Sequence, residues 1–191
     1  MQLYQFTILR IALTICLSVL LLIPAAWAAS GPSEYQVKAA FLYQFTKYTK
    51  WPGVFSLDST SQMNICLWGS NPFGEALSLF DKASSAKLTI SVKKNISSSD
   101  IASCHMLYIA KGAESQLSSI LSQAKASPVL TVSEIKGFSD QGGMIEIQTV
   151  EKTIGVFERN NVGLVINTKA AGKVAISFDA QLLEIAKSVI R

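Results

Sequence analysis

The chain has 191 residues, 49% of them apolar, and a formal net charge of +4. With one histidine, 13 acidic residues and no dense lysine run, this composition argues against a nucleic-acid-binding protein. It also offers neither a metal-ligand pair nor a cofactor motif. The apolar content is unevenly spread, so a membrane protein does not follow from it.

The first 28 residues have the three parts of a secretory leader. Arg10 is the only charge, Ile11 to Ile23 is almost continuously apolar, and Ala26-Trp27-Ala28 places small residues where a signal peptidase reads. The apolar run is shorter than the roughly 20 residues that a membrane-spanning helix needs. We expect residues 1–28 to be a cleaved signal peptide and residues 29–191 to form one exported, periplasmic domain. An uncleaved anchor is the alternative.

Two cysteines, Cys66 and Cys104, remain after such cleavage. An even number in an exported protein favours a disulfide, which would stabilise the domain by roughly 4 kcal/mol. Two free thiols or an intermolecular bond are the alternatives. His105 beside Cys104 is the one hint of a nucleophilic pair, but neighbours in a strand point to opposite faces. The sequence therefore predicts no enzyme, no metal and no cofactor.

The first half of the domain predicts alternating helices and strands. Ser33 and Gln36 form a capping box for a helix that ends at Trp51-Pro52-Gly53. The apolar stripe of this helix, expected to face the core, consists of Val37, Ala40, Phe41, Phe45 and Tyr48. Strands are then expected at 63–69, 87–93, 104–110 and 129–132, with helices at 72–82 and 114–126.

The second half predicts an antiparallel meander. Its strands are expected at 144–150, 153–158, 162–167 and 175–178. A final helix, capped by Ser177 or Asp179, would turn Leu182, Leu183, Ala186 and Val189 inward. The expected fold is a single α/β domain with a mixed sheet: a βαβ-like first half, an antiparallel β-rich second half, and helices packed on the sheet.

Aromatic side chains crowd the first helix and its exit. Core packing is the first interpretation, whereas Tyr43 lies off the apolar stripe and Trp51 sits in a turn. The lysines are scattered, which is typical of a solvated surface. As candidates for a partner or ligand surface we therefore take Lys38, Tyr43, Lys47, Trp51 and Trp68.

The opening Lys38-Ala39-Ala40-Phe41-Leu42-Tyr43, with Phe45 and Trp51-Pro52, resembles the first motif of YfiR-like proteins. Three later blocks and the tail are similar to those of the same family. They are Ile65-Cys66-Leu67 with Gly69 and Asn71 to Gly74; Cys104 to Ile109; Leu130 to Ser133 with Gly137-Phe138 and Gly142 to Ile145; and Ile166-Asn167 with Leu182-Leu183. Together they cover essentially all of the mature chain. The motif positions expected to be structural are Ala39, Ala40, Phe41, Phe45, Pro52, Gly69, Phe73, Gly74, Gly142 and Gly143.

The resemblance implies a periplasmic, non-catalytic regulator. Such a protein binds the periplasmic sensor region of an inner-membrane diguanylate cyclase and restrains it, which lowers cyclic di-GMP and biofilm formation. Cys66 and Cys104 match cysteines of the second and third blocks, and redox control of the disulfide belongs to the family picture.

Two departures accompany this resemblance. This chain lacks the additional C-terminal cysteine pair of some relatives, and Val150 to Val162 is longer than the family pattern. The alternative function is a small-molecule sensor or binding protein that acts on another membrane receptor. A small-molecule ligand and a homodimer are compatible with either function.

Overall fold

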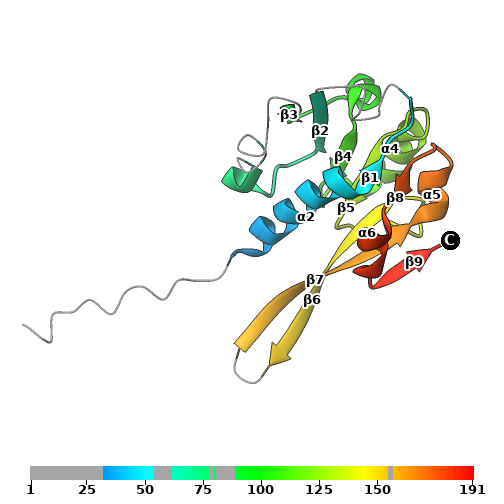
Figure 1. The fold of residues 1–191 in the computed structure, drawn as a ribbon. Coiled ribbons are helices and arrows are strands. Elements are labelled where there is room, and N and C mark those ends of the chain that lie inside the picture. The colour runs from blue at the N-terminus through cyan, green and yellow to red at the C-terminus, as the bar shows by residue number, and fades with distance from the viewer. Residues whose placement is uncertain (1–31, 54–61, 78–79, 81–88, 155–156) are drawn as a thin grey trace, which may run out of the picture. The chain divides into compact units, whose positions relative to one another are not determined.

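A computed structural model describes residues 32–53, 62–77, 80, 89–154 and 157–191 (Figure 1). These residues belong to one compact unit, Pro32–Arg191. The predicted signal peptide lies outside the described residues, so its cleavage stays a prediction. In the part of the chain that is described, no helix has the length and apolar character needed to cross a bilayer.

The centre of the unit is a seven-stranded sheet in the order β3-β2-β4-β5-β6-β7-β9. Every neighbouring pair is parallel except β6 and β7, which form a long antiparallel hairpin. The strands are β2 (Gln62–Trp68), β3 (Thr89–Lys93), β4 (Met106–Ile109), β5 (Leu130–Ser133), β6 (Ile145–Ile154), β7 (Phe157–Asn167) and β9 (Ser188–Ile190). The expected α/β domain with a mixed sheet is confirmed.

Helices cover both faces of this sheet. α2 (Glu34–Tyr48) lies across one face (Figure 1), and α4 (Leu117–Ala124) packs with the other. Side chains of the central strands alternate between the two apolar clusters: Met106 and Tyr108 of β4 join the α2 cluster, whereas Leu107 and Ile109 join the α4 cluster. This period-2 burial explains why these strands read as continuous apolar runs.

The start and end of α2 follow from local chemistry. The hydroxyl of Ser33 accepts a hydrogen bond from the amide of Gln36 (3.3 Å), and the Gln36 side chain accepts one from the amide of Ser33 (2.7 Å). The predicted capping box is therefore confirmed. The helix ends at Tyr48 because β1 (Thr49–Lys50) pairs with β8 (Ser177–Phe178) as a separate two-stranded sheet.

The second half differs from the predicted meander. The strands expected at 144–150, 153–158 and 162–167 merge into the two long strands β6 and β7, and β9 runs parallel to β7. The closing helix is only one short turn, α6 (Ala180–Glu184), capped by Asp179, and Val189 lies in strand β9 instead.

Other short elements were predicted in part or not at all. Part of the helix expected at 72–82 lies outside the described residues, and the described part contains the 3-10 turn η2 (Gly74–Leu77). The helix expected at 114–126 divides into η4 (Glu114–Gln116) and α4. Two short helices are additional to the prediction: η3 (Ser98–Ser103) and α5 (Thr168–Gly172).

The predicted disulfide between Cys66 and Cys104 is present, with 5.9 Å between the two Cα atoms. It joins β2 to Cys104, two residues before β4 begins, and both cysteines are fully buried in the α4 cluster. The bond thus fixes two neighbouring strands of the parallel sheet to each other.

Candidate functional site

The carboxyl ends of β2, β4 and β5 meet at one edge of the sheet, where α/β proteins commonly place their functional residues. Tyr108 lies near the end of β4, Glu134 directly follows β5, and Phe73 lies in the turn after β2. Lys38 of α2 reaches the same edge from above the sheet. The sequence thus brings four distant segments to one point.

Glu134 is the centre of a buried polar network, here called the Glu134 network. One carboxylate oxygen accepts hydrogen bonds from the hydroxyls of Tyr108 (2.7 Å) and Tyr35 (3.1 Å). The other pairs with the ammonium groups of Lys38 and of Lys111, the latter at 3.3 Å. Lys38 also pairs with Glu34 at 2.5 Å, one helical turn earlier. The side chain of Lys38 is 0% exposed and that of Glu134 only 2%.

The network keeps Glu134 and Lys38 charged despite their burial. Burial alone would raise the pKa of Glu134, but hydrogen bonds from Lys38 and Tyr108 outweigh it and lower that pKa. Burial alone would lower the pKa of Lys38, but its hydrogen bonds to Glu134 and Glu34 outweigh it and raise that pKa. Burial, with the Glu134 carboxylate beside it, raises the pKa of Tyr108 far above its ordinary value. Tyr108 therefore stays a neutral donor.

Aromatic rings pack around this network. The Phe73 ring contacts the Tyr108 ring edge-on at 4.7 Å between centroids and the Tyr35 ring at 5.8 Å. The ammonium group of Lys38 lies 4.8 Å from the centre of the Tyr35 ring. Lys38, Phe73 and Tyr108 come from three blocks of the resemblance, and Glu134 directly follows Ser133 of the fourth. The motifs that are far apart in the sequence thus build a single structure.

A pocket of about 650 Å³ opens beside the network, with Glu134 in its wall. Its charged lining is balanced: Lys111, Lys136 and Lys187 face Glu114, Glu134 and Glu146. The network itself has its charges paired and its tyrosine hydroxyls bonded. Such an arrangement suits fixing the position of α2 on the sheet rather than bond-breaking chemistry.

The rotation of α2 that this anchor fixes leaves part of its apolar stripe exposed. The residues buried beneath the helix are Lys38, Ala39, Leu42, Phe45 and Thr46. Of the stripe predicted to face the core, only Phe45 is fully buried, while Ala40 is exposed and Val37, Phe41 and Tyr48 are half-buried. The prediction is therefore confirmed for Phe45, and Phe41 and Tyr48 pack against the core with part of their surface exposed, whereas Ala40 is exposed, because periodicity identifies an apolar stripe but not what covers it.

The partly exposed side of the stripe lines a surface groove of about 560 Å³ between α2 and α6, here called the α2–α6 groove. Val37, Ala40, Phe41 and Tyr48 form one wall, and Ile185, just after α6, stands at the other with 59% of its surface exposed. The polar side chains of the lining are Gln44, Gln181 and Glu184. The groove is therefore largely apolar.

The five candidate surface residues have different environments. Lys38 and Trp51 are buried, which corrects their placement on the surface; the Trp51 indole donates a hydrogen bond to the carbonyl of His105 at 3.0 Å. Lys47 is exposed and Tyr43 half-buried, with the Lys47 ammonium 4.5 Å from the centre of the Tyr43 ring. Trp68 is half-buried against the α4 cluster.

The Cys104–His105 pair does not form a nucleophilic centre in this structure. The sulfur of Cys104 is bonded to Cys66. The imidazole of His105 is buried, and its Nδ1 accepts a hydrogen bond from the Asn64 amide at 3.2 Å. Burial, together with the positive charge of Lys93, lowers the pKa of His105. A neutral, structural histidine is the result.

Sequence reasoning missed Glu134 as well as the burial of Lys38. A signal for it existed: Glu134 is an acid directly after a strand with four buried positions, and Lys38 is a cation inside an apolar motif. Lone buried charges are rare unless they are paired. The two could therefore have been matched as partners, although 96 positions separate them.

Comparison with known proteins identifies the family. A family model described as YfiR/HmsC-like matches residues 35–187. The chain belongs to the YfiR/HmsC-like family. No curated protein matches the sequence.

Two solved structures are similar to this YfiR/HmsC-like chain. A conserved domain protein from Vibrio cholerae O1 biovar eltor strain N16961 shares 16% identity over 84% of this chain and 61% of its own, with a TM-score of 0.48. An ABC domain in complex with L-Trp from Streptococcus pneumonia shares 16% identity over 82% of this chain and 60% of its own, with a TM-score of 0.49. The chain spans about three fifths of the length of each.

Proposed function

We propose that this YfiR/HmsC-like protein is a non-enzymatic periplasmic regulator. In this role it binds the periplasmic sensor region of an inner-membrane diguanylate cyclase, restrains the cyclase and lowers cyclic di-GMP. The match of the family model to residues 35–187 carries the proposal. The buried disulfide supports it, because such bonds persist in oxidising compartments such as the periplasm. The predicted signal peptide agrees with that location.

The α2–α6 groove is the surface that we assign to the cyclase. Its apolar wall and the exposed Ile185 provide the kind of contact that binding to another protein buries. The Glu134 network holds α2 in the rotation that presents this wall. A regulator needs such a preformed face more than it needs a reactive group.

A genetic experiment tests the function. Deleting the gene should raise cellular cyclic di-GMP, and the unaltered protein should restore the lower level. The purified protein should also retain a membrane protein with a GGDEF domain from detergent-solubilised membranes, and mass spectrometry would identify it. Unchanged cyclic di-GMP in the deletion strain would contradict the proposed function.

A pair of variants tests the groove separately. Ile185→Glu places a charge in the apolar groove, so it should abolish both complementation and retention of the cyclase. The control is Ala102→Glu. Ala102 is exposed on η3, which packs against α4 on the other face of the sheet. If both variants complement equally, the groove is not the contact surface, although the regulatory function itself would stand.

A further inference from the structure

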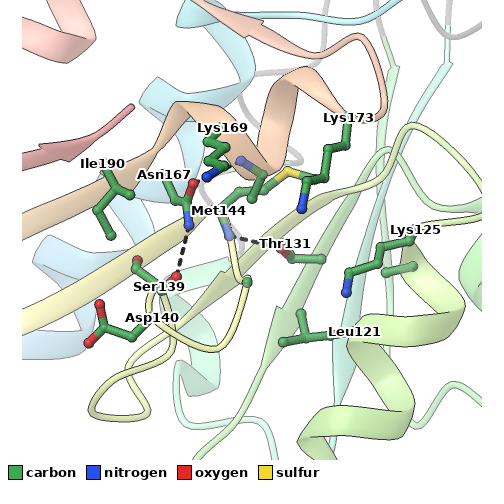
Figure 2. Close-up of a pocket in the computed structure, with 13 residues that line it drawn as sticks. Leu121, Lys125, Thr131, Ser139, Asp140, Met144, Asn167, Lys169, Lys173 and Ile190 are labelled. Atoms are coloured by element: carbon green, nitrogen blue, oxygen red, sulfur yellow. Dashed lines mark hydrogen bonds between the residues drawn. The ribbon is translucent and has the colours of Figure 1, made fainter.

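A second pocket, here called the lysine pocket, lies between α4, α5 and the loop that joins β5 to β6 (Figure 2). Its volume is about 310 Å³, at the lower end of the range of roughly 300–1,000 Å³ that small-molecule sites occupy. None of the residues of the Glu134 network lines it. A compact metabolite is the largest molecule that fits.

The charge of the lysine pocket is strongly one-sided. Lys125, Lys169 and Lys173 line it, with Asp140 as the one carboxylate among the described lining residues. In Figure 2 the ammonium groups of Lys125 and Lys173 extend into the space between the helices, and the Asp140 carboxylate points away from it. Among the described residues, no carboxylate forms an ion pair with any of the three lysines. The pocket thus carries an excess of positive charge.

The polar groups at the floor of the pocket already bond to the protein itself. The Asn167 side chain donates to the carbonyl of Ser139 (2.8 Å) and accepts from the amide of Ala170 (2.8 Å). The hydroxyl of Thr131 accepts a hydrogen bond from the amide of Met144 (3.1 Å). These bonds hold the floor in place before any ligand arrives. The lysine ammonium groups are therefore the principal donors left for a ligand.

Gly142, the first residue of the Gly142-Gly143 motif, lines the pocket. Gly142 has a φ of +96°, which favours glycine, and a Cβ atom at Gly143 would lie 2.1 Å from the Phe138 ring. Only glycine allows the loop to close over Phe138 in this way. The motif singled out in the sequence thus has a location and a reason that the regulatory function alone does not supply.

Apolar side chains complete the lining. Leu121, Ala124, Met144, Ala170 and Ile190 surround the cationic groups. An inorganic ion would leave this apolar surface uncovered. A ligand with a small carbon skeleton beside its acidic group would contact both parts of the lining.

We propose that the lysine pocket binds a small organic dianion. Lys125, Lys169 and Lys173 hold its acidic groups, and its carbon skeleton lies against the apolar wall. A phosphate monoester and a dicarboxylate share this chemistry. The site is independent of the α2–α6 groove, and it would give the domain a ligand-responsive region.

Calorimetric titration of the purified protein tests the proposal with three probes: phenyl phosphate, succinate and inorganic phosphate. Phenyl phosphate or succinate should bind more tightly than inorganic phosphate, and which of the two binds tells the phosphate monoester from the dicarboxylate. The Lys169→Gln/Lys173→Gln double variant should weaken that binding at least about tenfold. A tenfold change in the dissociation constant corresponds to about 1.4 kcal/mol, and each charge-assisted hydrogen bond contributes more than that. Amide NMR shifts should cluster at Gly142 and Ala170.

The matched control is Lys94→Gln/Lys136→Gln, which removes the same charge from exposed lysines outside the pocket. It should change the dissociation constant by no more than about twofold, which corresponds to less free energy than a single hydrogen bond contributes. The proposal would be overturned if neither organic probe bound at about 10 mM, a concentration at which even a ligand of millimolar affinity is detected. Equal weakening in both double variants would also overturn it, because the effect would then be one of net charge. Binding of inorganic phosphate as tight as that of the organic probes would exclude the carbon skeleton.

Discussion

The Glu134 network and the lysine pocket use the same side chain in opposite ways. Lys38 is fully buried and paired with two carboxylates, whereas Lys125, Lys169 and Lys173 are exposed and form no ion pair with the described carboxylates. A buried charge requires its partner within the fold, because no water replaces it. An exposed charge requires none and stays available to a ligand. Burial, rather than residue type, therefore separates an anchor from a binding site.

The largest expected effect comes from breaking the anchor. Lys38→Ala removes the cation inside the network, so we expect the free energy of unfolding to fall by about 3–5 kcal/mol. Urea denaturation measures it. The matched control on the same helix is the exposed Lys47, whose change to alanine should cost less than about 1 kcal/mol. A loss below about 1 kcal/mol in Lys38→Ala would show that the pair is no anchor.

The double variant Lys38→Met/Glu134→Gln sharpens this result. It removes both charges together and leaves no unpaired ion in the interior. We expect it to be more stable than Lys38→Ala, because most of the single variant's cost is a buried carboxylate left with only the exposed Lys111 as its cation. Equal or lower stability in the double variant would assign the cost to lost packing of the lysine stem.

The next largest effect is expected from Tyr108, the neutral hydrogen-bond donor to Glu134. Tyr108→Phe deletes one hydrogen bond to the Glu134 carboxylate and keeps the ring that packs on Phe73. A hydrogen bond to a charged group contributes about 1.5–3 kcal/mol, so the variant should lose that much in chemical denaturation. Tyr35→Phe should lose less, because Tyr35 is only half-buried and its bond is longer. The reverse order would contradict the assigned centre of the network.

A smaller effect should appear as a dependence on pH. The pKa of Glu134 is lower in the folded state than its ordinary value of 4.5, so the unfolded chain binds more protons as the pH falls below that value. Stability from this group is complete above about pH 5 and is lost as the pH falls through the folded-state pKa. The slope should flatten in Glu134→Gln by at most about 1.4 kcal/mol per pH unit. An identical slope in both proteins would show that Glu134 does not contribute to the dependence of stability on pH.

The smallest effect is expected at the other end of the comparison. The Lys169→Gln/Lys173→Gln variant should change the free energy of unfolding by no more than about 0.5 kcal/mol without ligand, since both side chains are exposed. Thermal denaturation in buffer without added anions measures this. A loss above about 2 kcal/mol would show that these lysines are structural, like Lys38.

The same contrast explains what the sequence could predict. The sequence predicted the capping box of α2 and the parallel strands, because these depend on nearby residues. It predicted the disulfide because an even number of cysteines remains in the domain. The burial of Lys38 depends on Glu134, 96 positions away, and no local pattern contains that distance. The closing segment failed for the same reason. Leu182, Leu183, Ala186 and Val189 have helical spacing, but Ser188–Ile190 forms a strand because it pairs with β7.

The position of Lys38 near the beginning of the domain has a consequence for the order of folding. The carbonyl of Tyr48, where α2 ends, accepts a hydrogen bond from the amide of Asp179 (2.8 Å), and β1 pairs with β8. The first helix of the domain is therefore held in part by residues from the end of the chain. Such long sequence separations slow folding. Until Glu134 arrives, Lys38 has only Glu34 of its own helix as a partner, and the apolar side chains of α2 are uncovered, so α2 is the segment that a chaperone would hold during folding.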